Sequence, residues 1–219
     1  VEKINENSFQ TFNNGVKQIV TEILYVIIPK KIGTLVLPEI RYQGEEVIGE
    51  NIGSIFQNFG SFNQKKIRRI IKKSKSKNIE VLPIPQEFKG WWLPASNLLI
   101  EEKIEPDAKE YIIGEPITRT ISIYANGVYA EQIPDLKFNF PSKIKAYTDN
   151  PVLNTEKNKF GVKGYRVEKW ALIPNDKGEI FLPEISINWW DVKDDKLRNS
   201  KVASRMLKIL PNIKNEFDK

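Results

Sequence analysis

One twelve-residue pattern occurs twice in this chain, and it constrains the fold more than any other feature. The segments PKKIGTLVLPEI (29–40) and PNDKGEIFLPEI (174–185) share P-x-x-x-G-x-x-x-L-P-E-I without a gap, 145 residues apart. In each copy we expect a strand to end at the first proline, a turn to pivot on the glycine, and a second strand to follow. The pattern therefore predicts two equivalent hairpins, and hence two domains of one type, the first entered partway through.

Apolar and polar residues alternate with a period of two in much of the chain. These stretches are rich in β-branched and aromatic residues, and Gly, Pro and Asn-Asp turn signals bound them. The clearest are 17–28, 117–125, 164–173 and 179–190. Because no amphipathic helix separates them, antiparallel sheets are favoured over a parallel α/β sheet. The sequence predicts an all-β fold of tandem immunoglobulin-like antiparallel β-sandwich domains.

The two predicted domains meet near residues 84–90, where a closing strand runs into a proline-rich linker. We expect residues 1–87 to be the C-terminal part of a first sandwich, with a loop and a basic insertion at 43–77. We expect residues 88–212 to form the second sandwich and 213–219 to be a polar tail. Because the chain opens on a valine, we interpret it as a piece of a longer precursor.

The chain contains no Cys and no His, which excludes several kinds of site. Disulfides, Cys/His zinc sites, and Ser-His-Asp or Cys-His triads all need one of these residues. An enzyme would have to use carboxylates, Lys or Tyr alone. We therefore expect a non-enzymatic protein without a cofactor or a metal site. A glycoside hydrolase built on two carboxylates is the weakest alternative, because it needs a cleft that sandwiches of this size seldom form.

The net charge of +6 comes from a basic segment at 65–77, KKIRRIIKKSKSK, which carries eight Lys or Arg residues and no acid. Without it, 26 basic residues face 28 acidic ones, so the charge does not indicate a nucleic-acid-binding protein. We expect either a solvated loop or a helix with its isoleucines on one face, which could contact an anionic surface. The residues assigned to that contact are Lys65, Lys66, Arg68, Arg69, Lys72 and Lys73.

Two tryptophan pairs stand out, Trp91–Trp92 and Trp189–Trp190. Since successive side chains of a strand point to opposite faces, we expect at least one Trp of each pair to be buried in the core. A pair that is exposed and coplanar would instead favour a carbohydrate-binding platform.

Arg119 is a charged residue inside a predicted strand, and we expect it to form a structural ion pair with Glu115 or Asp191. The DVKDD segment at 191–195 begins like an oxygen-rich cation loop, but it lacks the glycine and the distant glutamate of an EF-hand. We therefore do not expect a calcium site there.

Several segments, in order, resemble the BatD family of aerotolerance, or oxygen-tolerance, proteins. They are WWLPASNLLIEE, GEPITRTISIYANGVYAEQIPDL, KAYTDNP, GYRVEKWALIPNDKGEIFLPEISINWWDV and the late LKILP, and they cover most of residues 88–212. The upstream YVIIPKKIGTLVLPEIRYQG also resembles the end of the preceding domain of that family. The matching positions, each a family marker and a candidate interaction residue, are Gly114, Glu115, Pro116, Arg119, Gln132, Pro134, Trp190 and Asp191.

The resemblance implies an exported protein with an N-terminal signal and a transmembrane segment after its β domains. This piece would then lie at the periplasmic face of the inner membrane, with the signal and the anchor outside it. Members of the family are encoded beside a MoxR-type AAA+ ATPase, von Willebrand factor A domain proteins and tetratricopeptide-repeat proteins, and they are linked to stress and oxygen tolerance. The resemblance implies no enzymatic activity.

The leading functional hypothesis is therefore a non-catalytic scaffold that docks partner proteins at the membrane surface. By resemblance, the expected partners are the von Willebrand factor A domain and tetratricopeptide-repeat proteins, with an anionic membrane surface as a further contact and no nucleic acid. The alternative is a carbohydrate-binding module that uses the Trp pairs.

Overall fold

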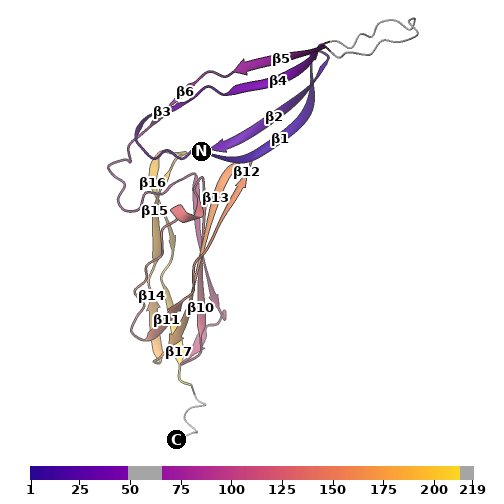
Figure 1. Ribbon diagram of the computed structural model, residues 1–219. Helices are drawn as coiled ribbons and strands as arrows, with labels where there is room; N and C mark the ends of the chain where they lie inside the picture. The colour runs from indigo at the N-terminus through magenta and orange to yellow at the C-terminus, as the bar shows by residue number, and fades with distance from the viewer. Residues whose placement is uncertain (49–65, 213–219) are drawn as a thin grey trace, which may run out of the picture. The chain divides into compact units, whose positions relative to one another are not determined.

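The computed structural model describes residues 1–48 and 66–212, and this part of the chain is almost entirely β (Figure 1). Its one helical element is a short 3-10 helix, η1 (Ala130–Gln132). The all-β expectation is confirmed. No helix in the described ranges is long and apolar enough to cross a membrane.

The chain divides into two compact units. One is Pro29–Pro83, and the other combines Val1–Ile28 with Ile84–Lys219. The boundary at 83/84 lies beside the predicted junction, whereas the first 28 residues group with the larger unit and not with the rest of the predicted first domain.

The larger unit contains a five-stranded antiparallel sheet in the order β11-β13-β10-β8, with β12 also paired to β13. These strands form because apolar residues recur at every second position. In β10 the burial alternates without a break, so that one face of the strand is fully covered. The bounds are β8 (Asn97–Glu105), β10 (Ile117–Asn126), β11 (Ile144–Thr148), β12 (Val152–Asn158) and β13 (Gly161–Pro174).

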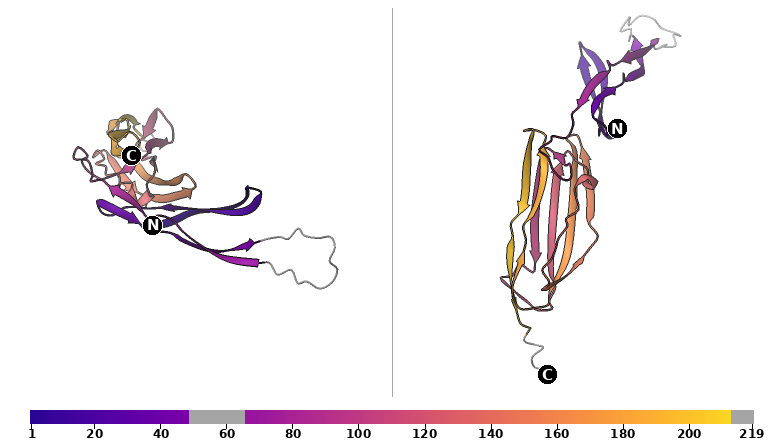
Figure 2. Two further views of the ribbon diagram at one scale, coloured as in Figure 1. Left: turned by 90° about the horizontal axis from the view of Figure 1, so that it is seen from above. Right: turned by 90° about the vertical axis from the view of Figure 1, so that its left-hand side faces the viewer.

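Two three-stranded sheets complete the core of this unit, in the orders β14-β17-β9 and β16-β15-β7. The pairs β17–β9 and β15–β7 are parallel, and the others are antiparallel. The views in Figure 2 show these strands running side by side with those of the five-stranded sheet. The bounds are β7 (Pro94–Ala95), β9 (Glu110–Ile112), β14 (Gly178–Leu182), β15 (Ile185–Asp191), β16 (Lys196–Val202) and β17 (Arg205–Leu210).

All three sheets contribute side chains to one hydrophobic core. Ile121 and Ile123 of β10 belong to the same buried cluster as Leu182 of β14 and Leu207 of β17. In each of these strands alternate residues face the core, and most of the core-facing residues are apolar.

A separate hairpin, β1 (Glu2–Asn13) and β2 (Val16–Val26), opens the chain. Its turn is Asn14-Gly15 with positive φ at both residues, the two-residue turn that matches the twist of a hairpin. Glu2 joins the hairpin to the rest of the larger unit. It accepts a hydrogen bond from Tyr129 at 2.6 Å and pairs with Lys157 of β12 at 2.5 Å.

The smaller unit consists of two antiparallel strand pairs, β3–β6 and β4–β5. The basic segment was expected to be a loop or a helix, and this expectation is wrong, because β5 is a strand. Its isoleucines are β-branched, and the register sets Arg68 and Arg69 opposite Glu46 and Glu45 of β4. Two acidic residues of the neighbouring strand therefore lie opposite the basic run in the register. The bounds are β3 (Gly33–Leu37), β4 (Arg41–Ile48), β5 (Lys66–Lys73) and β6 (Lys77–Val81).

The glycine of the repeated pattern has the same φ in both copies, but the pattern does not form a hairpin in either. Gly33 and Gly178 both have φ of 105° and both begin a strand. The strand before the turn does not pair with the strand after it, since β3 pairs with β6 and β14 pairs with β17. The turn carries the chain from one sheet to another, which corrects the predicted hairpins.

The equivalence extends beyond the pattern to the pairing of six consecutive strands. The hairpin β1–β2 precedes β3 as the hairpin β12–β13 precedes β14. Afterwards β3–β6 encloses β4–β5, as β14–β17 encloses β15–β16. Even the outer register matches, with Gly33 opposite Val81 and Gly178 opposite Ile209. We refer to β1–β6 as the first strand set and to β12–β17 as the second strand set.

The tryptophans follow the predicted alternation in the second pair. Trp189 faces the hydrophobic core, and Trp190 is buried on the opposite face of β15, beneath Trp92. In the first pair Trp92 is half-buried and stacks edge-on against Phe88, with ring centroids 4.9 Å apart, whereas Trp91 is exposed. Burial is therefore complete for the second pair and partial for the first.

We predict that Trp189→Ala lowers the free energy of unfolding by about 3–5 kcal/mol, because it leaves a cavity in the core. Phe181→Ala is the matched control, since Phe181 points outward from β14 and should cost less than about 1 kcal/mol. Urea unfolding of the two variants measures both. Equal losses would contradict the assignment of faces.

Candidate functional site

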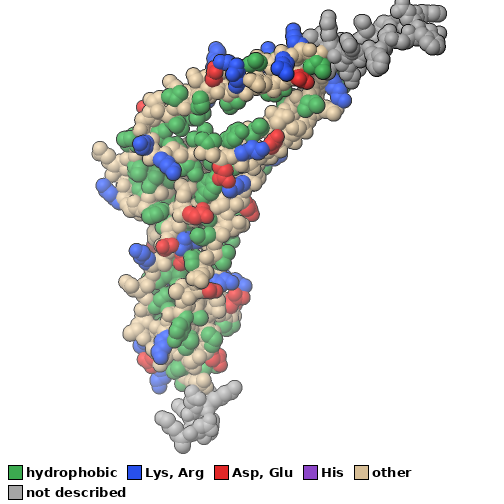
Figure 3. Space-filling model, viewed as in Figure 1, with side chains coloured by type: hydrophobic (Ala, Val, Ile, Leu, Met, Phe, Trp, Pro, Cys, Tyr) green, Lys and Arg blue, Asp and Glu red, His purple; other side chains and the backbone are tan. Residues whose placement is uncertain are grey.

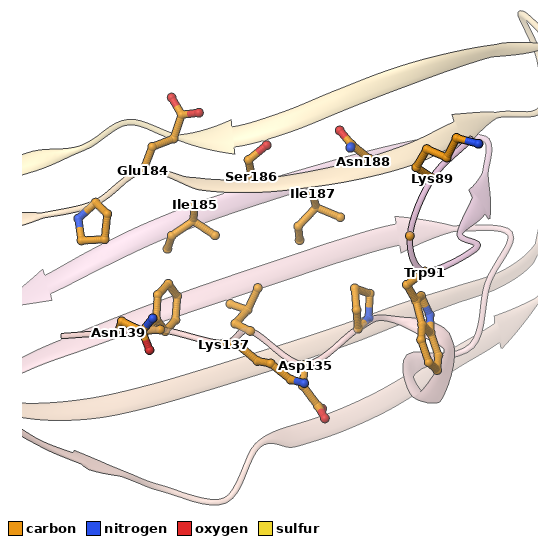
Figure 4. Close-up of a pocket in the computed structure, with 15 residues that line it drawn as sticks. Lys89, Trp91, Asp135, Lys137, Asn139, Glu184, Ile185, Ser186, Ile187 and Asn188 are labelled. Carbon is orange, nitrogen blue, oxygen red and sulfur yellow. The ribbon is translucent and has the colours of Figure 1, made fainter. Parts of the chain in front are cut away.

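A groove of about 750 Å³ runs along β15 in the larger unit (Figure 4). Residues 183–188 line one side and residues 134–139 line the other, while residues 89–91 lie at one end. Both segments that form the walls are held in place by contacts outside the groove. β15 is held by β16, and the segment 134–139 is anchored to β13 through side chains.

Apolar side chains from both walls line the floor of the groove. Figure 4 shows Ile185 and Ile187 pointing from β15 into the space between the walls, while Ser186 and Asn188 point away from it. Phe138 of the opposite wall packs edge-on against Trp170 in the core, with ring centroids 4.7 Å apart. The floor of the groove is therefore apolar and belongs to the hydrophobic core.

One side of β15, the side away from β16, lacks a strand partner along this groove among the described residues. The Trp190 N–H donates to Leu93 O at 2.9 Å on the side of β15 away from β16. Because hydrogen-bonding directions alternate along an antiparallel strand, Ser186 and Asn188 direct their N–H and C=O groups to that same side. Within residues 1–48 and 66–212, no strand pairs with β15 on that side between Ile185 and Trp189.

Charged side chains hold the opposite wall in place. Arg166 of β13 pairs with Asp135 of the wall and, at 2.5 Å, with Glu168. Glu168 also accepts the Leu136 N–H at 3.1 Å. Asp135 therefore forms a structural ion pair with Arg166. Lys89, Lys137 and Glu184 add mixed charges around the groove (Figure 4).

Trp91 marks the end of the groove. Its indole N–H donates to the backbone oxygen of Gln132 at 2.7 Å, which fixes the ring while leaving it exposed. The Gln132 side chain in turn accepts the Tyr129 N–H at 2.8 Å and caps η1. Pro134, another of the family-marker positions, lines the groove directly.

Arg119 is fully buried on the inner face of β10, and its partner differs from the predicted ones. Its Nε donates to Glu102 of β8 at 2.8 Å, and Glu102 also lies 3.3 Å from Arg205. The register explains the pairing, because Glu102 lies diagonally across from Arg119, whereas Glu115 lies on an exposed turn. The predicted pairing with Glu115 or Asp191 is therefore wrong.

The remaining hydrogen-bonding capacity of Arg119 is not used by the described residues. Nη1 and Nη2 have no acceptor among them, and the guanidinium lies 5.2 Å from the centroid of the Phe138 ring. Burial lowers the pKa of Arg119 from its ordinary value, and the charge of Glu102 opposes this effect. The cation thus lies beneath the apolar wall of the groove and depends on a single carboxylate.

Asp191 organises the loop that connects β15 and β16. Its carboxylate accepts the backbone N–H groups of Lys193 and Asp194 and pairs with Arg198 at 2.5 Å. The neighbouring Trp190 donates its indole N–H to Asp195 at 3.0 Å. These contacts give Trp190 and Asp191 a structural role at the end of the hairpin. No group of three or more acidic residues placed to hold a metal ion occurs in the described ranges.

Gly114, Glu115 and Pro116 form the exposed turn between β9 and β10. Gly114 has φ of 82°, and its N–H donates to Pro174 O at 2.9 Å. The residues that carry the resemblance in sequence thus lie on several elements: this turn, β10, η1, the groove wall and the end of β15. Only Gln132 and Pro134 adjoin the groove, and the unpaired side of β15 had no sequence signal.

The basic residues lie in the smaller unit. Lys65 is outside the described residues, and Lys66 is described only as part of the backbone of β5. Arg68, Arg69, Lys72 and Lys73 are exposed on β5, and Lys73 pairs with Glu39 at 2.7 Å. Arg68, too, interacts with another residue. The basic surface is therefore partly compensated by acids.

No protein-family model, curated protein or solved structure matches this chain. The function must therefore be inferred from the groove and its residues.

We predict that Glu102→Gln costs about 3–5 kcal/mol of unfolding free energy, because it leaves the buried Arg119 cation without its carboxylate. Replacing both partners, Arg119→Met with Glu102→Leu, should recover most of that loss. Urea unfolding of the single and double variants gives the coupling. Additive losses would contradict a buried, mutually dependent pair.

A second prediction concerns acid stability. Burial opposes ionisation of Asp191, but the Lys193 N–H, Arg198 and the Asp194 N–H together hold its pKa below the ordinary value. The ionised carboxylate therefore stabilises the native state above about pH 4, and this contribution is lost as the pH falls through the lower native pKa. Asp191→Asn should be less stable than wild type at pH 7, with the difference narrowing toward pH 2 in urea unfolding. A difference independent of pH would contradict this account.

Proposed function

We propose that this chain is a non-catalytic docking protein of the BatD type, and that the groove along β15 receives an extended segment of a partner protein. The observation that carries the proposal is the unpaired side of β15 over an apolar floor. A strand edge with free N–H and C=O groups pairs readily with an added strand, and pockets for alternate side chains supply specificity.

The groove favours a segment with a particular chemistry. The main chain of the partner would exchange hydrogen bonds with Ser186 and Asn188. Every second side chain would be apolar, to cover Ile185 and Ile187 on the floor. Acidic groups beside Lys89 or Lys137, and a basic group beside Glu184, would complement the rim.

The resemblance to BatD proteins supports the cellular setting that we propose. There the chain would form tandem immunoglobulin-like sandwiches at the periplasmic face of the inner membrane and take part in stress or oxygen tolerance. Its partners would be von Willebrand factor A domain and tetratricopeptide-repeat proteins. The exposed cations Arg69 and Lys72 of β5 support a secondary contact with an anionic membrane surface.

One observation favours the carbohydrate-binding alternative. Trp91 exposes its ring at the end of the groove, where a sugar could stack on it. Against this, its neighbour Trp92 packs onto Phe88 and Trp190, so the pair does not offer two coplanar exposed rings. A peptide therefore explains more of the groove than a glycan does.

The decisive variant is Asn188→Pro, which removes one N–H from the unpaired side of β15 and places a ring there. We predict that it weakens capture of a von Willebrand factor A domain or tetratricopeptide-repeat protein from envelope extract about tenfold or more, since a lost hydrogen bond and a clash combine. Mass spectrometry identifies and quantifies the captured protein on immobilised chain.

Asn199→Pro is the matched control. Asn199 lies directly opposite Asn188 in the β15–β16 register, and its N–H points to the other side of the hairpin. Both prolines also sever the same side-chain hydrogen bond between the two asparagines. Equal loss of capture in both variants, or capture of a polysaccharide that depends on Trp91, would reject peptide docking at this edge.

A further inference from the structure

The first and second strand sets differ in how their equivalent side chains are covered. The two sequences align without a gap from Tyr25 to Ile40 and from Trp170 to Ile185. Tyr25 is 47% exposed and Trp170 only 5%, although both are aromatic and lie at the same position before the repeated pattern. Ile40 is 67% exposed, whereas its equivalent Ile185 is 4% exposed.

The same difference recurs on β3 and β6. Leu35 and Leu37 of β3 are half-buried, while their equivalents Ile180 and Leu182 belong to the core. On β6 the half-buried Ile79 is equivalent to the buried Leu207. β3 and β6 thus keep apolar residues of the kind that form a core, but these residues are only half-buried.

The outward faces do not show this difference. Val36 of β3 is 56% exposed, and its equivalent Phe181 is 51% exposed. The alternation of β3 therefore has the same phase as that of β14. Between β3 and β14 only the core-facing side changes in burial. Figure 3 shows hydrophobic side chains at the surface of the first strand set.

In the second strand set the covering comes from strands that precede it in the chain. β10 pairs with β13 from Ile117 to Asn126, and β8 extends the same sheet. Ile100 of β8 and Ile121 of β10 lie in the core with Leu182. In the first strand set β2 is equivalent to β13, and within the described residues it pairs only with β1.

We infer that the apolar side of β3 and β6 in the smaller unit is a docking surface for a β layer like β8 and β10, supplied by the parent polypeptide on the N-terminal side of β1. The order of the repeat selects this source, because β8 and β10 precede β12. Alternate apolar side chains of that layer cover Leu35, Leu37 and Ile40. The inference does not depend on the groove at β15.

The absence of native cysteine allows a direct test. Single variants Ile40→Cys and Val36→Cys are made in the present 219-residue chain and in a chain extended upstream along its natural reading frame by a length like that of residues 94–148. Thiol reactivity depends on exposure, so the rate of maleimide labelling reports whether each site is covered. Ile185→Cys and Phe181→Cys provide the covered and open references at equivalent positions.

The expected result is that both sites label rapidly in the present chain. In the extended chain Ile40→Cys should slow about tenfold or more while Val36→Cys keeps its rate. Tryptophan fluorescence verifies folding of the second strand set, because every Trp lies between positions 91 and 190. Unchanged labelling of Ile40→Cys in the extended chain overturns the inference. Protection in the present chain that rises with protein concentration also overturns it, since a second copy would then cover the face.

Discussion

The burial of alternate side chains between the five-stranded sheet and its two facing sheets is the interaction on which the rest of the structure depends. Ile121 and Ile123 of β10 and Leu182 of β14 are among the most fully buried residues in the chain. The turn at Gly178 makes this packing possible, because it carries the chain out of the first sheet and into the opposing one. The positions of the β15–β16 loop and of the groove follow from where these sheets lie.

Most of the residues that carry the resemblance to BatD proteins make structural contacts in this arrangement. Arg119 pairs with Glu102 across two neighbouring strands, and Asp191 holds the β15–β16 loop through Arg198. These contacts fix both walls of the groove, since Phe138 lies over Arg119 and Asp191 ends β15. A site built from a strand edge and a rigid floor suits recognition of another polypeptide, and it needs neither His nor Cys.

The sequence supported the strand assignments where alternation was strong, as in β10 and in the repeated pattern around Gly33 and Gly178. It could not show that the strands flanking each glycine join different sheets, because a turn signal does not specify the partner of the next strand. The strand β5 was missed because its cations dominate its composition, while the acids opposite them, Glu45 and Glu46, lie on β4.

The groove and the partner of Arg119 could not be predicted from the sequence for a related reason. Glu102 becomes the nearest carboxylate only through the β8–β10 register, and Glu115 is closer along the chain. The free side of β15 exists because β7 pairs with only its last two residues. Burial of Trp190 likewise depends on Trp92, which is nearly a hundred residues away in sequence. Each of these features is a property of pairing and not of local pattern.

The most direct test of the account compares equivalent strands of the two strand sets within the present chain. Amide hydrogen exchange measured by mass spectrometry reports local opening free energies strand by strand. The account predicts slow exchange in β14 and β17 and exchange at least about tenfold faster in β3 and β6, since the same pairing lacks a covering layer there. Equal protection of β3 and β14 at low protein concentration would contradict it.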